Sequence, residues 1–106
     1  ETHVEENRIQ YRQKLADAME ILQPLLPVRA PEAGFYLWLK VPNGGEVFAR
    51  HLFQRYNVTV LPGAYLGRGQ GADNPGLPYV RIAMVQPRNE NKEGIQRIAA
   101  AIRDLI

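Results

Sequence analysis

The 106-residue chain contains neither cysteine nor serine, and it has only two histidines. Without cysteine there are no disulfides and no thiolate ligands, which fits a cytoplasmic location. A hydroxyl nucleophile would have to be Thr2 or Thr59, and neither has the neighbours of a catalytic triad, while the three lysines, Lys14, Lys40 and Lys92, are expected to be solvated. His3 and His51 have no carboxylate or cysteine neighbours at metal-ligand spacing. We therefore predict no metal site and no nucleophile within this chain.

Long apolar runs and clusters of like charge are also absent. No segment approaches the roughly 20 apolar residues needed to span a membrane, and the start of the chain has no signal-peptide pattern. The net charge is +2, with basic residues spread along the chain, which argues against a nucleic-acid partner. With 45% hydrophobic residues, residues 1–106 can form one domain with a two-layer core, but the chain is small for a complete metabolic enzyme.

Six segments show helical or strand periodicity. They are a helix ending before Pro24, a strand over 33–41, a helix ending near Asn57, strands over 58–61 and 77–85, and a helix after Asn89 or Asn91. This order predicts an α+β two-layer sandwich, with the helices packed on one face of a small, mainly antiparallel sheet in the order α-β-α-β-β-α.

A glycine-rich segment separates the last two predicted strands. Residues 63–78 hold five of the nine glycines and almost no apolar periodicity, so we expect a mobile or ligand-covering loop. The Gly-Arg-Gly-Gln-Gly run at 67–71 could suggest a phosphate-binding loop. No helix follows it directly, however, so it does not fit a nucleotide-binding motif, and we expect Arg68 to be solvated.

The strand over 77–85 carries one charge, Arg81, at its centre. Alternation places Arg81 on the face opposite Val80, Ile82 and Met84, which are purely apolar. An arginine at a central strand position is costly to desolvate unless an anion meets it. The residue pattern leaves two alternatives open, an internal carboxylate or a bound ligand.

The strand over 33–41 places two aromatic residues, Tyr36 and Trp38, away from its apolar face. If the helices cover the apolar side of the sheet, these residues and Arg81 lie together on a face that this chain leaves uncovered. We expect a group outside the chain to cover it.

Three segments together resemble a known family. Residues 33–38 (AGFYLW), 60–67 (VLPGAYLG) and 79–83 (YVRIA) are similar, in order and spacing, to motifs of the small C-terminal domain of class I/II pyridoxal-phosphate-dependent aminotransferases of fold type I. The resemblance covers nearly the whole chain and is strongest to bacterial succinyldiaminopimelate aminotransferases of lysine biosynthesis. One departure is Tyr65, where the family commonly has phenylalanine.

The resemblance implies that this chain is the small domain of a longer enzyme, a homodimer, that transfers an amino group between an amino acid and a 2-oxo acid. Arg81 matches the arginine that binds the substrate's α-carboxylate, and Phe35 and Tyr36 match positions near the substrate side chain. The family's Schiff-base lysine and the residues that bind the cofactor's phosphate and pyridine nitrogen lie in a large domain with no counterpart here. We therefore predict no catalytic residue in this chain, no bound pyridoxal phosphate and no activity of the chain alone.

A second class of function also fits the residue pattern. The chain could be a free-standing α+β binding module whose aromatic and basic sheet face stacks on a small ligand or a nucleobase. A longer reading frame that contains a cofactor-binding lysine would favour the aminotransferase.

Overall fold

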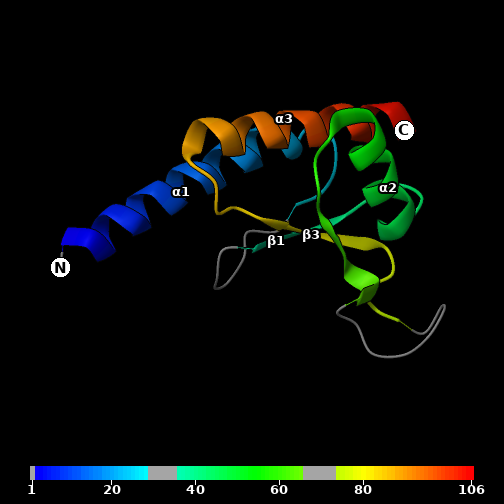
Figure 1. Cartoon of the computed structure of the whole chain (residues 1–106), viewed down its shortest axis with the longest axis horizontal. Helices are drawn as coiled ribbons and strands as arrows, with labels where there is room; N and C mark the ends of the chain where they lie inside the picture. Colours follow the sequence, from blue (N-terminus) through cyan, green and yellow to red (C-terminus); the bar gives the residue numbers. More distant parts are fainter. Residues whose placement is uncertain (1, 29–35, 66–73) are drawn as a thin grey trace.

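The computed structural model describes residues 2–28, 36–65 and 74–106, and the order of its elements is the predicted one. The elements are α1 (Thr2–Leu22), β1 (Tyr36–Lys40), α2 (Gly45–Tyr56), β2 (Leu61–Pro62), the short 3-10 helix η1 (Gly63–Tyr65), β3 (Tyr79–Ala83) and α3 (Arg88–Leu105), as seen in Figure 1. Three helices and a three-stranded antiparallel sheet confirm the α+β fold.

The sheet has the order β1-β3-β2, so β3 is its central strand. Both pairings are antiparallel, and Arg81 of β3 lies opposite Trp38 of β1 on one side and Leu61 of β2 on the other. Residues directly opposite one another share a face of the sheet. The chain's pairing therefore brings Arg81, Trp38 and Leu61 to one face.

The strands are shorter than predicted, and one is displaced. The prediction over 58–61 is wrong for residues 58–60: only Leu61 and Pro62 pair with β3. Proline is tolerated there because β2 is an edge strand. The third predicted strand, over 77–85, is reduced to Tyr79–Ala83, and residues 33–35 of the first lie outside the described residues.

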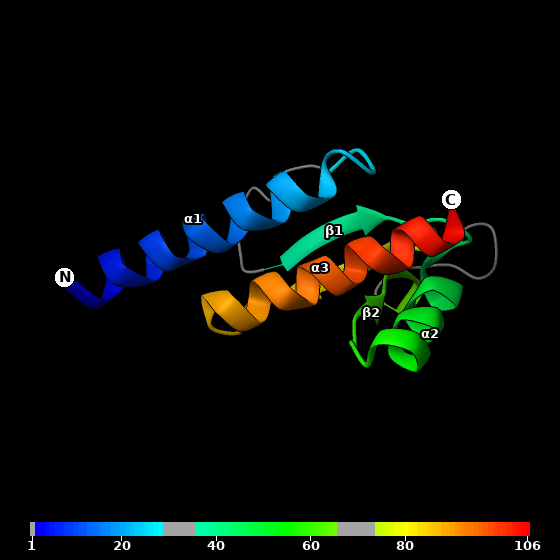
Figure 2. The same ribbon diagram turned by 90° about the horizontal axis from the view of Figure 1, so that it is seen from above.

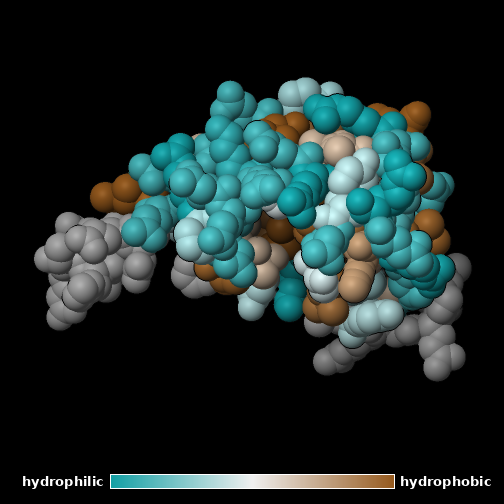
Figure 3. All heavy atoms as spheres, turned by 45° about the horizontal axis from the view of Figure 1, so that its top comes forward, coloured by the Kyte–Doolittle hydropathy of each residue, from teal (hydrophilic) through white to brown (hydrophobic). Residues whose placement is uncertain are grey.

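The helices cover the apolar face of the sheet, as Figures 1 and 2 show. Alternate residues of β1 and β3 are buried and meet the helices in a single core. The core side chains include Leu37, Leu39, Val80, Ile82, Met84, Phe48, Leu52, Ile95, Ile98, Ile102, Ala18 and Leu22. The outward side of the helix layer is mostly hydrophilic (Figure 3), so the apolar residues of the helices are directed toward the sheet.

The two long helices, α1 and α3, lie side by side and run in the same direction (Figure 2). An ion pair joins them: the Arg88 guanidinium donates from Nε to Asp17 Oδ2 (2.9 Å) and from Nη2 to Oδ1 (3.2 Å). Helix α3 begins at Arg88, directly after Pro87, and so earlier than the predicted start at Asn89 or Asn91. None of the helices in the described part of the chain is both long and apolar enough to cross a membrane.

Helix α2 is fixed at both ends. Asn57 ends it in the left-handed conformation (φ 56°, ψ 37°) with its N–H donating to Phe53 O, which confirms the predicted cap. At the start, Gly45 donates to Leu77 O (2.9 Å) and packs directly against the backbone of Tyr79. A Cβ at position 45 would lie 2.1 Å from Tyr79 O, so only glycine permits this approach of α2 to β3.

The two ends of the glycine-rich segment are tied together by Asn74. Its Nδ2 donates to Ala64 O (2.7 Å), and its Oδ1 accepts from Gly76 N (2.9 Å). Of the loop predicted over 63–78, residues 66–73 lie outside the described residues. In its described ends, the hydrogen bonds of Asn74 hold η1 beside the turn that precedes β3.

Candidate functional site

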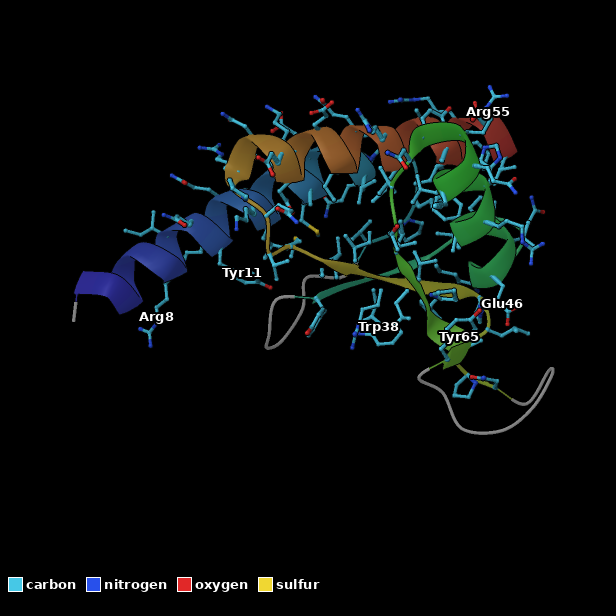
Figure 4. The ribbon with its side chains drawn as sticks, viewed as in Figure 1. Arg8, Tyr11, Trp38, Glu46, Arg55 and Tyr65 are labelled. Atoms are coloured by element: carbon cyan, nitrogen blue, oxygen red, sulfur yellow. The ribbon has the colours of Figure 1, made fainter. Side chains whose placement is uncertain are left out.

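The sheet face that no described helix covers carries an aromatic and basic cluster. We call it the aromatic face and define it as Tyr36, Trp38, Tyr79 and Arg81. Tyr36 and Trp38 are 41% and 42% exposed although they belong to a paired strand of the sheet. Trp38 points away from the helices in Figure 4. Exposed aromatic residues gathered on one face indicate a contact surface.

Arg81 occupies the centre of this face and is half-buried. Its Cζ lies 4.1 Å from the centroid of the Tyr36 ring, which is a cation–π contact. Tyr36 reaches it diagonally, because Tyr36 pairs in register with Ala83, two residues along β3.

The second aromatic pair of the face lies on the other diagonal. Trp38 and Tyr79 form an edge contact, with ring centroids 6.5 Å apart and planes at 78°. The Arg81 tip thus turns toward Tyr36, while Trp38 turns toward Tyr79.

No carboxylate neutralises Arg81 among the side chains that the structure describes. The ion pairs found there are Asp17–Arg88, Glu93–Arg97 and His51–Asp104. Of the two alternatives for Arg81, the internal carboxylate has no candidate in the described part of the chain. A cation–π contact leaves the N–H groups of a guanidinium free for a carboxylate, which its planar fork can bind with two hydrogen bonds.

The other predicted site residues are only partly described. Tyr36 lies on the aromatic face, beside Arg81. Phe35 lies outside the described residues. Tyr65, which departs from the family pattern, is 68% exposed at the end of η1, on the same side of the sheet as Trp38 in Figure 4.

None of the three lysines of this chain lies in surroundings that suit a Schiff base with pyridoxal phosphate. Lys40 and Lys92 are exposed, and Lys14 is half-buried on α1, so none has the enclosed surroundings that a Schiff-base lysine needs. In the described part of the chain, no group of three or more histidine, aspartate or glutamate side chains is arranged to hold a metal.

The sequence did not reveal a polar cluster between α2 and α3. Asp104 Oδ2 accepts a hydrogen bond from the Tyr56 hydroxyl and lies 3.0 Å from His51 Nε2. The hydrogen bonds from Tyr56 and His51 lower the pKa of Asp104, and the same carboxylate raises the pKa of Tyr56. The partners are about fifty positions apart in sequence, so no local spacing could reveal this cluster.

A hollow of about 440 Å³ lies elsewhere, between the segment 57–60, the end of β3 and the first half of α3. Its walls do not include Tyr36, Trp38 or Arg81, so it is separate from the aromatic face.

Comparison with known proteins identifies relatives over nearly the whole chain. Residues 1–98 match the family model described as aminotransferase class I and II. A curated relative, the LL-diaminopimelate aminotransferase of Dehalococcoides mccartyi, is 29% identical over 99 residues, which are 91% of this chain and 24% of the relative.

Two solved structures share the fold. An aminotransferase from Neisseria meningitidis is 41% identical with a TM-score of 0.87, and the match covers 95% of this chain and 26% of that one. A probable N-succinyldiaminopimelate aminotransferase from Thermus thermophilus is 32% identical with a TM-score of 0.71, over 87% of this chain and 24% of that one. The chain spans about a quarter of the length of these relatives.

Proposed function

The chain belongs to the class I and II aminotransferases, and from this premise we propose that it is the substrate-recognition domain of a longer, pyridoxal-phosphate-dependent enzyme. In this proposal residues 1–106 form one domain, and Arg81 binds the α-carboxylate of the amino acid and of the 2-oxo acid. Phe35 and Tyr36 lie near the substrate side chain. The cofactor, its lysine and its phosphate-binding residues belong to the larger part of the enzyme, which is a homodimer.

One observation carries the proposal: Arg81 stands at the centre of an uncovered sheet face without a described carboxylate partner. A strand fixes the direction of its side chain more firmly than a loop would, and a planar fork suits a carboxylate. The exposed Tyr36 and Trp38 give the rest of the enzyme an apolar surface to cover. A fragment that offers a carboxylate clamp without a cofactor site has no electron sink, so we expect it to be inactive alone.

For the substrate we propose a diaminopimelate derivative, with N-succinyl-diaminopimelate as the amino donor in lysine biosynthesis. The Thermus thermophilus relative, which bears the succinylated name, supports it. The curated relative named for LL-diaminopimelate supports the free diamino acid as the second candidate. The full-length enzyme should be assayed with a panel of amino donors that contains both compounds. The donor with the higher kcat/KM identifies which of the two candidates is the substrate.

The clamp is tested by Arg81→Lys in the full-length enzyme. Lysine keeps the charge but loses the two-pronged geometry, so we expect kcat/KM for the amino donor to fall by about 10- to 100-fold, as for the loss of a hydrogen bond to a charged group. The matched control is Arg103→Lys, because Arg103 is exposed on the last turn of α3. Kinetics of Arg81→Lys equal to those of the control would refute the clamp.

A further inference from the structure

We propose that Tyr36 is a positioning residue for Arg81: its ring supports one face of the guanidinium and so directs the N–H edge toward the substrate carboxylate. This inference rests on the proposed function, because it assumes that Arg81 is the clamp. It assigns Tyr36 a task on the arginine itself, in addition to its expected place near the substrate side chain.

The sheet register creates the stack. Tyr36 lies directly opposite Ala83, whose side chain is a single methyl group, so the space over the Tyr36 ring is open on the β3 side. Arg81, the next residue on the same face of β3, reaches diagonally into this space and brings Cζ to 4.1 Å from the ring centroid. A long side chain at position 83 would compete for the same space.

The neighbours of Arg81 leave Tyr36 as its aromatic support. Trp38 lies directly opposite Arg81, but its ring makes an edge contact with Tyr79. On the other strand the residue opposite Arg81 is Leu61, which has no π-system. Among the described residues, the guanidinium therefore has one cation–π contact, with Tyr36.

Stacking and carboxylate binding use different parts of the guanidinium. The ring takes the planar face, and the carboxylate takes the N–H groups at the edge, so the two contacts are compatible. An arginine side chain that is free to rotate loses rotamer entropy when it binds an anion. An aromatic support removes part of that loss before the substrate arrives, which is preorganisation.

The tyrosine hydroxyl has no part in this role, which separates it from direct hydrogen bonding to the substrate. In the full-length enzyme we expect Tyr36→Leu to raise KM for the amino donor by about 3- to 30-fold with little change in kcat, since it removes a cation–π contact of that strength. Tyr36→Phe keeps the ring, so we expect it to raise KM by less than Tyr36→Leu does. An equal rise in KM in Tyr36→Leu and Tyr36→Phe, or no rise in either variant, would overturn the inference.

The kinetics of Arg81→Lys distinguish a failure of the positioning role of Tyr36 from a failure of the proposed function. If Arg81→Lys is harmless, the clamp itself is wrong. If Arg81→Lys is damaging and Tyr36→Leu is not, the clamp stands and the positioning role falls.

A second measurement does not depend on activity and uses the 106-residue chain. The Arg81 Nε–H proton, identified by the signal that disappears in Arg81→Lys, should be shifted upfield in NMR spectra by the Tyr36 ring current. Tyr36→Leu should remove that shift and Tyr36→Phe should retain it, while backbone signals of the core residues Leu37 and Val80 report that the fold is intact. Phe53→Leu removes an exposed ring from α2 and should leave the Arg81 signal in place. An Arg81 signal that Tyr36→Leu does not move would contradict the stack.

Discussion

Two arginines in this chain, Arg88 and Arg81, differ in whether a carboxylate of the same chain binds them. Arg88 is 51% exposed and donates two hydrogen bonds to the buried Asp17 carboxylate, so its charge is used inside the domain. Arg81 has a cation–π contact with Tyr36 and no carboxylate partner among the described side chains. A charge that the fold does not neutralise is available for a ligand.

The Asp17–Arg88 pair predicts a pH dependence of stability. The Arg88 hydrogen bonds, opposed by burial and assisted by the Arg88 and Lys92 charges, lower the pKa of Asp17. A carboxyl group whose pKa is lower in the folded state stabilises the fold. The full contribution is present above the unfolded pKa of about 4, and it is lost as the pH falls through the folded-state pKa. Asp17→Asn should therefore cost about 1 kcal/mol of unfolding free energy at pH 7, less than a buried charged hydrogen bond contributes, because Arg88 is half exposed.

Urea unfolding of the wild type and Asp17→Asn at pH 7 and near pH 3 measures this effect. The stability advantage of the wild type over the variant should be smaller at the lower pH. Glu20→Gln, at an exposed position of α1, is the control for removing a carboxylate. A stability difference between wild type and Asp17→Asn that is the same at both pH values would contradict the assignment.

Sequence reasoning could identify Arg81 because a single charge in an apolar strand is visible locally. It could not identify the partner of Arg88, because Asp17 is 71 residues away and only the packing of α1 on α3 brings them together. The Tyr36–Arg81 stack was missed for a related reason: the alternation of side chains gives the face, but the diagonal contact depends on the register between β1 and β3.

At the scale of elements, backbone contacts place α2 and the strands. Gly45 and Gly63 both lie so close to the Tyr79 backbone that a Cβ would come within 3 Å of its carbonyl oxygen. These approaches hold the start of α2 and of η1 against the first residue of β3, two positions before Arg81. The position of β3, and with it Arg81, along the sheet thus depends on these two glycines.

A matched pair of glycine substitutions tests this dependence. Gly45→Ala would place its Cβ 2.1 Å from Tyr79 O and 3.0 Å from Tyr79 C, atoms of the backbone that cannot rotate away. We expect a loss of about 3 kcal/mol in the free energy of unfolding, as for severe overpacking. At Gly94, inside α3, a Cβ meets nothing within 4 Å, so Gly94→Ala should stabilise by about 0.5–1 kcal/mol through helix propensity. Urea unfolding measures the change in unfolding free energy for both variants. Changes of the same sign in Gly45→Ala and Gly94→Ala would contradict the prediction.

The sequence predicted the three α-helices, the three strands and their order, but not the short 3-10 helix η1 or all of the boundaries. The ends of α1 and α2 are encoded locally, by Pro24 and by the left-handed Asn57. The extent of β2 is not, because Val58, Thr59 and Val60 have good strand propensity and yet lie where the chain no longer pairs with β3. Whether a segment pairs with a neighbouring strand depends on the tertiary fold, and strand propensity alone does not predict it.

At the scale of the whole molecule, the helices cover one face of the sheet, and no helix among the described residues covers the other. The covered face holds the core, and the outer surface of the helices is mostly hydrophilic (Figure 3). The aromatic face carries the exposed rings of Tyr36 and Trp38 around Arg81. Because the chain spans about a quarter of the length of its relatives, we propose that the rest of the enzyme covers this face and brings the cofactor to Arg81.

This arrangement predicts that the activity can be divided between two polypeptides. The 106-residue chain, which has its own core, should fold when expressed alone but show no transamination with added pyridoxal phosphate, because its lysines do not fit a cofactor site. The remainder of the enzyme, without these residues, should bind the cofactor but lack the carboxylate clamp. Mixing the two should restore turnover, measured as 2-oxo acid formed from the amino donor.

A mixture made with Arg81→Lys should remain at least about 10-fold less active, the loss expected from the missing bidentate contact, while Arg103→Lys restores activity fully. Full activity of either piece alone would show that the clamp and the cofactor site are not divided in this way.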